Sequence, residues 1–279
     1  MNIQTAIKKG QSILRDNNIL SAQLDSEILM IKAISKDKKY LILNLHKEIK
    51  KRDLCYFDFL ISERVKSKPI AQIIKKKDFW KYEFVVNEDV LIPRPDTEVL
   101  VEQVLELTKN KNKLKVLDIG TGSGCILISI LKEKKNFIGT GIDISNKSLK
   151  ISKVNSHKLG VNNRLRLLKS NIDNFSRGKY DLIISNPPYI KKNDLKCLEK
   201  DINFEPKQAL DGGFDGLSEM SKVITKSSKL IKKNGYLILE IGFDQKSRVI
   251  KILKNKGFYI KKIVKDLSNH DRCIVSIKI

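Results

Sequence analysis

The chain has 279 residues, 41% of them hydrophobic and 31% charged, proportions typical of a globular protein with one large domain or an average domain and a smaller companion. It lacks a run of about eighteen apolar residues that could span a bilayer and lacks a signal peptide at its start, so we expect a cytoplasmic protein without a membrane partner. The formal net charge is +23, but its lysines are spread along the whole sequence, so we interpret the charge as compositional background, and direct nucleic-acid binding is the less favoured explanation.

Apolar residues recur at helical spacing through residues 1–75, most clearly from Leu54 to Val65. The spacing predicts an N-terminal domain built as a bundle of four or five helices. Ser21 and Asp53 are candidate caps for the helices that follow them, because their side-chain oxygens can accept hydrogen bonds from free backbone N–H groups.

The pattern changes in residues 76–93, which we interpret as a linker. Aromatic and β-branched residues within 78–92 flank Asn87, Glu88 and Asp89. That arrangement predicts a short β-hairpin.

From residue 94 to residue 279 short apolar strands alternate with helical stretches. The predicted strands cover 114–119, 137–143, 165–168, 180–185, 236–241, 258–264 and 272–279. Strands separated by helices indicate a doubly wound, Rossmann-like α/β domain, and the last two form an antiparallel hairpin. The four cysteines are widely separated and form no CxxC pair, so we expect free thiols and no metal site. We also expect a monomer.

A glycine-rich turn follows the first strand of this domain, with Gly120, Gly122 and Gly124 at every second position. A dinucleotide fingerprint would require a third glycine where Cys125 stands, so a pyrophosphate fits this loop poorly. An acid before GxGxG, here Asp118, resembles methyltransferases that use S-adenosylmethionine. We therefore expect this loop, including Thr121 and Ser123, to bind that cofactor. The alternative is that the loop is only a tight strand-to-helix turn.

Three further strand ends complete the predicted cofactor site. Asp143 ends the second strand, where a doubly wound fold places the acid that binds ribose hydroxyls, although it could also cap the next helix. Adenine contacts are expected from Asn171 or Ile172, after the third strand. Asn186, after the fourth, is expected beside the cofactor.

The fourth strand ends in Asn186, Pro187, Pro188 and Tyr189, which lie at the same edge of the sheet. The Asn186 side-chain oxygen and the Pro187 carbonyl can accept the two hydrogens of a planar NH₂ group, because the prolines fix the backbone. Two acceptors would aim the nitrogen at a methyl donor and stabilise its developing charge. Tyr189 offers a flat face for the substrate. These four residues are the predicted catalytic residues, and the alternative is a loop that only ends the strand.

This motif leaves two kinds of planar target: an exocyclic amine of a nucleic-acid base, as in N6-adenine methyltransferases, or a protein side-chain amide. A non-catalytic RNA- or ribosome-binding module is a further alternative suggested by the charge. Intact glycines in the loop and the intact Asn186 weigh against that module.

Several further stretches are similar to the HemK-type (PrmC) release-factor glutamine methyltransferases. They are KDFW at 77–80, LIPRPDTE at 91–98, NPPYI at 186–190, FEP with AL at 204–210 and DGGFDGL at 211–217. This resemblance implies N5-methylation of the glutamine in the Gly-Gly-Gln loop of class 1 peptide chain release factors, with S-adenosylmethionine as donor. It implies cofactor roles for the three loop glycines and Asp143, and a glutamine site formed by the NPPY residues.

The resemblance also implies that the N-terminal domain recognises the release factor and that Arg94, Thr97 and Glu98 shape the site. The alternative to a role in shaping the site is that Asp96 or Thr97 caps the helix that follows. Phe204 and Glu205 are expected to support the substrate loop. This sequence departs from the family pattern at Lys75, Asn171 and Ser268.

Overall fold

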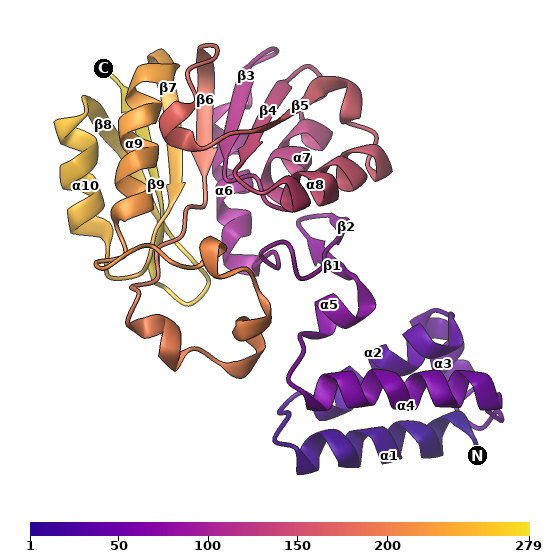
Figure 1. The fold of residues 1–279 in the computed structure, drawn as a ribbon. Helices are drawn as coiled ribbons and strands as arrows, with labels where there is room; N and C mark the ends of the chain where they lie inside the picture. Colours follow the sequence, from indigo (N-terminus) through magenta and orange to yellow (C-terminus); the bar gives the residue numbers. More distant parts are fainter. The chain divides into compact units, whose positions relative to one another are not determined.

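The computed structural model describes residues 1–279, which divide into two compact units. One unit comprises Met1–Lys76 together with Glu199–Phe204, and the other comprises Lys77–Leu198 and Glu205–Ile279. The first unit contains the expected helices (Figure 1): α1 (Ile3–Asp16), α2 (Ala22–Ile34), α3 (Lys38–Leu43), α4 (Lys51–Val65) and α5 (Ile70–Ile74). Leu14, Leu29, Met30 and Phe57 are fully buried among them and form the centre of this unit's core.

The two predicted helix caps are wrong in their details. Helix α4 begins at Lys51, so Asp53 lies within its first turn instead of before it. Ser21 does precede α2, but its hydroxyl donates to Asp25 Oδ2 at 2.8 Å and makes no capping bond. A nearby carboxylate therefore competes successfully with the backbone for this hydroxyl.

A buried ion pair connects the first unit's helices to the segment Glu199–Phe204. The Arg64 Nε atom donates to Asp25 Oδ2 at 2.7 Å, and its Nη1 atom donates to Asp201 Oδ2 at 2.8 Å. Arg64 and Asp25 are buried, whereas Asp201 is partly exposed. Gln72 adds a bond from Nε2 to the Phe204 carbonyl at 3.0 Å. Residues 199–204 thus complete a unit whose other members precede them by more than a hundred positions.

The hairpin lies earlier in the chain than the sequence pattern predicts. Its strands are β1 (Lys76–Phe79) and β2 (Tyr82–Val85), and Trp80 adopts a φ of 58° in the turn between them. Residues 87–89 instead form a turn in which Asn87 Oδ1 accepts from the Asp89 N–H at 3.1 Å. No strand follows, because the Ile92 N–H bonds to the Glu205 carboxylate and not to a neighbouring strand.

The second unit contains a seven-stranded sheet in the order β5-β4-β3-β6-β7-β9-β8. All pairs are parallel except those made by β9, which runs antiparallel to β7 and β8. The strands are β3 (Lys115–Ile119), β4 (Ile138–Asp143), β5 (Leu165–Lys169), β6 (Tyr180–Ser185), β7 (Ile231–Glu240), β8 (Phe258–Lys265) and β9 (Asp271–Lys278). The predicted doubly wound sheet with a final antiparallel hairpin is confirmed, and β7 begins five residues earlier than expected.

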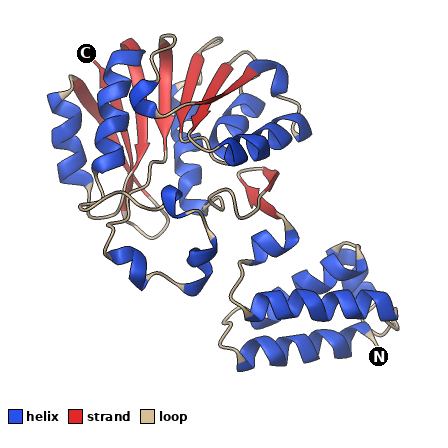
Figure 2. Ribbon diagram, viewed as in Figure 1, coloured by secondary structure: helices blue, strands red, loops and turns tan.

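Helices cover both faces of this sheet, as Figure 2 shows in blue around the red strands. They are α6 (Glu98–Leu107), α7 (Cys125–Glu133), α8 (Asn146–Lys158), α9 (Ser218–Leu230) and α10 (Lys246–Asn255). Short 3₁₀ turns occur at Pro95–Thr97, Asn162–Arg164, Ile172–Asn174, Asp194–Cys197, Lys200–Phe204 and Lys207–Ala209. Alternate strand residues pack against α6 and α7 on one face and against α9 and α10 on the other, which gives the unit two apolar cores.

No helix of the chain combines the length and apolar character needed to cross a membrane. All four cysteines are free thiols, and Cys125 and Cys273 are buried.

Candidate functional site

A cavity of about 500 Å³ opens where β3, β4 and β6 end. In a doubly wound sheet ligands bind at this edge, between strands whose connections run to opposite faces. Among the residues that line it are Gly120, Gly122, Asp143, Asn171, Ile172, Asn186, Pro187 and Pro188. Eight of the residues predicted for the site are therefore brought together around one cavity.

The glycine loop divides its residues between the cavity and the protein interior. Gly120 has a φ of 75°, and a Cβ atom there would meet no atom within 4 Å. Gly124 has a φ of 82°, but a Cβ atom there would lie 2.5 Å from Ser152 Oγ. Thr121 and Ser123 are buried and do not line the cavity. Gly120 and Gly122 thus border the ligand space, whereas Gly124 permits close packing against α8.

Asp118 stabilises this loop from the protein interior. Its side chain is buried, and its Oδ2 atom accepts from the Thr121 hydroxyl at 2.7 Å. Burial raises the pKa of Asp118 to about 7, against an opposing effect of the Thr121 bond. Asp118 therefore shapes the turn and does not itself line the cavity.

Asp143 joins the glycine loop to the start of α8. Its Oδ2 accepts from the Gly122 N–H and its Oδ1 from the Ser145 N–H, each at 2.9 Å. Burial raises the pKa of the carboxyl group, while these backbone bonds lower it. Each carboxylate oxygen has a further lone pair, so Asp143 can also accept hydrogen bonds from ligand hydroxyls. The capping alternative fails, because Ser145 and not Asp143 caps α8.

Asn171 and Ile172 line the cavity after β5. The Asn171 side-chain oxygen is already bonded to the Asp173 N–H at 3.0 Å. Its amide nitrogen is the polar group left for a ligand, and buried Ile172 offers an apolar surface.

Asn186 and Pro187 each leave one oxygen unbonded. The Asn186 Nδ2 atom donates to Thr97 Oγ1 at 3.2 Å, which orients its side-chain amide. No donor of the chain bonds to Asn186 Oδ1 or to the Pro187 carbonyl oxygen. Two unbonded acceptors thus stand beside the cavity, as the sequence motif predicts for binding an NH₂ group.

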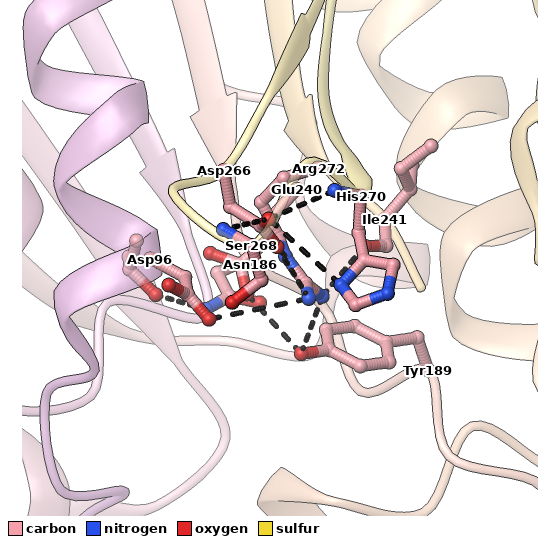
Figure 3. A network of polar contacts seen from close by, with 10 residues as sticks. Asp96, Asn186, Tyr189, Glu240, Ile241, Asp266, Ser268, His270 and Arg272 are labelled. Carbon is pink, nitrogen blue, oxygen red and sulfur yellow. Dashed lines mark hydrogen bonds and ion pairs between the residues drawn. The ribbon is translucent and has the colours of Figure 1, made fainter. Parts of the chain in front are cut away.

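Tyr189 belongs to a network of polar contacts (Figure 3) and not to the cavity lining. Its hydroxyl donates to Glu240 Oε1 at 3.3 Å and lies 3.5 Å from the Nη1 atom of Arg272. Burial, followed by the negative charge of Glu240, raises the pKa of Tyr189. Sequence reasoning missed Glu240, and the only signal for it is an acid at the end of a buried strand.

The residues that the resemblance assigns to site shaping have defined partners. Arg94 forms an ion pair with Glu205, whose other oxygen accepts from the Ile92 N–H at 2.8 Å. The Glu98 carboxylate accepts from the Trp80 N–H at 2.7 Å and so fixes the hairpin turn. Neither Asp96 nor Thr97 caps α6 through its side chain, so the capping alternative is not supported. Phe204 lies in the other unit, where its carbonyl accepts from Gln72 Nε2 at 3.0 Å.

The cavity fits the predicted S-adenosylmethionine. The backbone at Gly120 leaves open space for close approach, an acid is available for ribose hydroxyls, and an apolar side chain is available for adenine. This donor set suits a nucleoside with an amino-acid portion better than a phosphate, because carboxylates repel phosphates.

Two family models match the chain. A methyltransferase domain model matches residues 110–274, and a PrmC N-terminal domain model matches residues 5–74. Together they cover the sheet domain and the N-terminal helices.

Several curated relatives are similar over most of the chain. A release factor glutamine methyltransferase of Clostridium acetobutylicum is 38% identical, with 100% of this chain and 99% of that protein covered. One of Caulobacter vibrioides is 33% identical, with 95% and 92% covered. A bifunctional methyltransferase of Rickettsia bellii is 36% identical over 98% of this chain, which spans about half of that protein's length (54%).

Two solved structures share the fold of the sheet domain. A methyltransferase from Pyrococcus furiosus has a TM-score of 0.54 at 18% identity and covers 70% of this chain and 88% of its own. A ribosomal protein L11 methylase from Lactobacillus delbrueckii subsp. bulgaricus has a TM-score of 0.52 at 19% identity, with 73% and 90% covered.

Proposed function

Since this chain belongs to the release factor glutamine methyltransferase family, we propose that it methylates N5 of the glutamine in the Gly-Gly-Gln loop of class 1 peptide chain release factors. Of all the observations in the structure, the pair of unbonded acceptors at Asn186 and Pro187 carries the proposal. Both residues line the cavity, and two acceptors suit a primary amide, which presents two N–H groups in one plane.

S-adenosylmethionine is the methyl donor of this family of enzymes. Gly120, Gly122 and Asp143 would hold it, with Asn171 and Ile172 beside its adenine. When bound, it supplies a methyl group made electrophilic by the positively charged sulfur.

The chain's own residues position the glutamine. Asn186 Oδ1 and the Pro187 carbonyl would accept the two N–H groups, so that the amide nitrogen faces the methyl group in line. The nitrogen gains positive charge as its bond to carbon forms, and the two oxygens stabilise that charge in a partly buried site. The extra proton can leave after transfer, so no general base is needed beforehand. Tyr189 would pack its ring against the side chain of the glutamine.

The N-terminal unit would recognise the release factor away from the glutamine. Its match to the PrmC N-terminal domain supports this role. A separate recognition surface would explain how one small amide is selected among the many glutamines of a cell.

Methyl transfer from labelled S-adenosylmethionine to a purified class 1 release factor tests the proposal. A release factor with alanine in place of the Gly-Gly-Gln glutamine and a DNA duplex serve as controls. We expect label on the intact factor alone. Label on the altered factor would move the target to another residue, and label on DNA would favour the adenine methyltransferase alternative.

A further inference from the structure

Glu240 is a buried acid at the end of β7 for which the proposed reaction provides no role. Only 2% of its surface is exposed, and its Oε2 atom has no hydrogen-bond partner. Burial raises its pKa to about 7. A carboxylate buried without a directly bonded cation destabilises a fold, so its presence at the edge of an active site calls for a functional explanation.

The first contact of Glu240 leads to one end of the NPPY motif. Its Oε1 atom accepts from the Tyr189 hydroxyl at 3.3 Å, and Arg272 Nη1 approaches the same hydroxyl oxygen at 3.5 Å. The hydroxyl therefore donates on one side and accepts on the other. Because both partners lie on neighbouring strands of the sheet, β7 and β9, they fix the direction in which the Tyr189 ring can lie.

Arg272 is itself held in place by the loop between β8 and β9. Its Nε and Nη2 atoms lie 3.0 and 2.9 Å from Asp266 Oδ2, and its Nη1 donates to the Ile241 carbonyl at 3.2 Å. Asp266 Oδ1 accepts from the Ser268 and His270 N–H groups, each at 2.9 Å. These bonds give the segment 266–272, to which the proposed reaction assigns no role, a part in holding Arg272.

Thr97, which lies near Glu240, connects it to the other end of the motif. Thr97 Oγ1 accepts from Asn186 Nδ2, so its own hydroxyl hydrogen can point elsewhere. That hydroxyl lies near Glu240 and lowers the pKa of its carboxyl group, although it stands outside hydrogen-bond geometry in this structure. Of the two polar side chains of the NPPY motif, Tyr189 therefore bonds directly to Glu240, and Asn186 bonds to Thr97, whose hydroxyl lies near the carboxylate.

We propose that Glu240, in its ionised form, is the positioning residue that holds Tyr189 and Asn186 in the geometry that receives the glutamine amide. Arg272 assists by holding the Tyr189 hydroxyl from the opposite side. This inference rests on the proposed glutamine methylation and adds a residue that acts on the NPPY side chains and does not itself touch the substrate.

The protonation state of Glu240 should then set the rate. An ionised carboxylate only accepts hydrogen bonds, whereas a protonated one also donates and would compete with the Tyr189 hydroxyl. The charged or titratable groups that face it are Tyr189, Arg272, Asp96, Cys125 and Cys273. Burial raises the pKa of the tyrosine and of both thiols, so these stay neutral near pH 7. The rate should therefore fall as the pH drops through about 7.

The test compares the wild type with Glu240→Gln in single-turnover methyl transfer to the release factor, from about pH 6 to about pH 9. The glutamine keeps the shape and one acceptor oxygen but does not titrate. We expect a rate lower by about tenfold at pH 8 and no acidic fall near pH 7, because misplaced reacting groups cost one to two orders of magnitude. The KM for the release factor and the Kd for S-adenosylmethionine should stay within about twofold of the wild type, since neither ligand touches Glu240.

A measurement without turnover accompanies it. In the free enzyme carrying ¹³C-labelled glutamate, one carboxyl resonance should titrate near pH 7, and it should be missing from Glu240→Gln. Exposed Glu106→Gln serves as the matched control, because Glu106 pairs only with Lys262 at the surface. It should leave the rate, its pH profile and that resonance unchanged.

The outcomes separate this inference from the proposed function. A wild type that labels no release factor overturns the proposed function. If the wild type is active and Glu240→Gln has the same rate and the same pH profile, the positioning role is overturned. If Glu240→Gln does not fold, Tyr189→Phe decides, because it removes only the hydroxyl: loss of the acidic fall supports the role, and an unchanged profile overturns it.

Discussion

Replacing Gly120 by alanine should weaken cofactor binding at a modest cost in stability. Gly120 has a φ of 75°, in the left-handed region that disfavours other residues by about 1–2 kcal/mol. A Cβ atom there meets no atom of the chain within 4 Å, so no steric term is added to the folded state. In a domain of this size the backbone term lowers the Tm by roughly 2–8 °C.

The cofactor would meet that methyl group, because Gly120 lines the cavity. Forcing an extra methyl group into a filled space costs about 1–3 kcal/mol. This is a rise of about five- to 150-fold in the Kd for S-adenosylmethionine.

Gly160 provides a matched control for the stability cost of placing alanine in a left-handed backbone conformation. Its φ is 67°, a Cβ atom there also meets nothing within 4 Å, and it lies outside the cavity. Calorimetric unfolding and calorimetric titration with S-adenosylmethionine should show similar Tm losses for the two alanine variants and weakened binding for Gly120→Ala alone. Equal Kd values would refute the placement of the cofactor beside Gly120.

Three further changes have definite expectations. Asn186→Ala should slow methyl transfer by about 100-fold or more, since it removes one acceptor for the developing charge, and a rate near that of the wild type would contradict the mechanism. Arg64→Ala leaves Asp25 buried without its cation and should lower the free energy of unfolding by about 3–5 kcal/mol in denaturant titrations of the full chain. For Asp118 the folded pKa of about 7 exceeds the ordinary value of 3.8, so the folded state binds the proton more tightly and stability falls as the pH rises between these values. Asp118→Asn should remove that loss, on the order of 4 kcal/mol, and an unchanged pH dependence of unfolding would show that the group is not so perturbed.

The sequence predicted the sheet and eight of the residues that line the cavity because those features are local. Strand periodicity, the glycine turn and an acid at the end of β4 each depend on a few neighbouring residues. The motif NPPY likewise carries its own backbone restriction, since two prolines fix the chain without help from distant residues.

The interactions that the sequence did not predict join distant positions. The Glu240 network brings residues of the loop before α6, the end of β6, β7 and β9 to one point, and no local period encodes that convergence. The sequence pattern predicts the β-hairpin too late in the chain for a similar reason. Val90 and Ile92 look like strand residues, but the Ile92 N–H is taken by Glu205, which lies 113 positions later in the chain.

The segment Glu199–Phe204 also has a consequence for how the protein is made. Arg64 and Asp25 leave the ribosome early, but Asp201 is 137 residues beyond Arg64. At a synthesis rate of about 20 residues per second the helices wait about 7 seconds for their last partner, and longer at slower rates. During that interval Arg64 has only Asp25 as a carboxylate partner, and the N-terminal helices remain an incomplete unit until more than half of the methyltransferase domain has been synthesised.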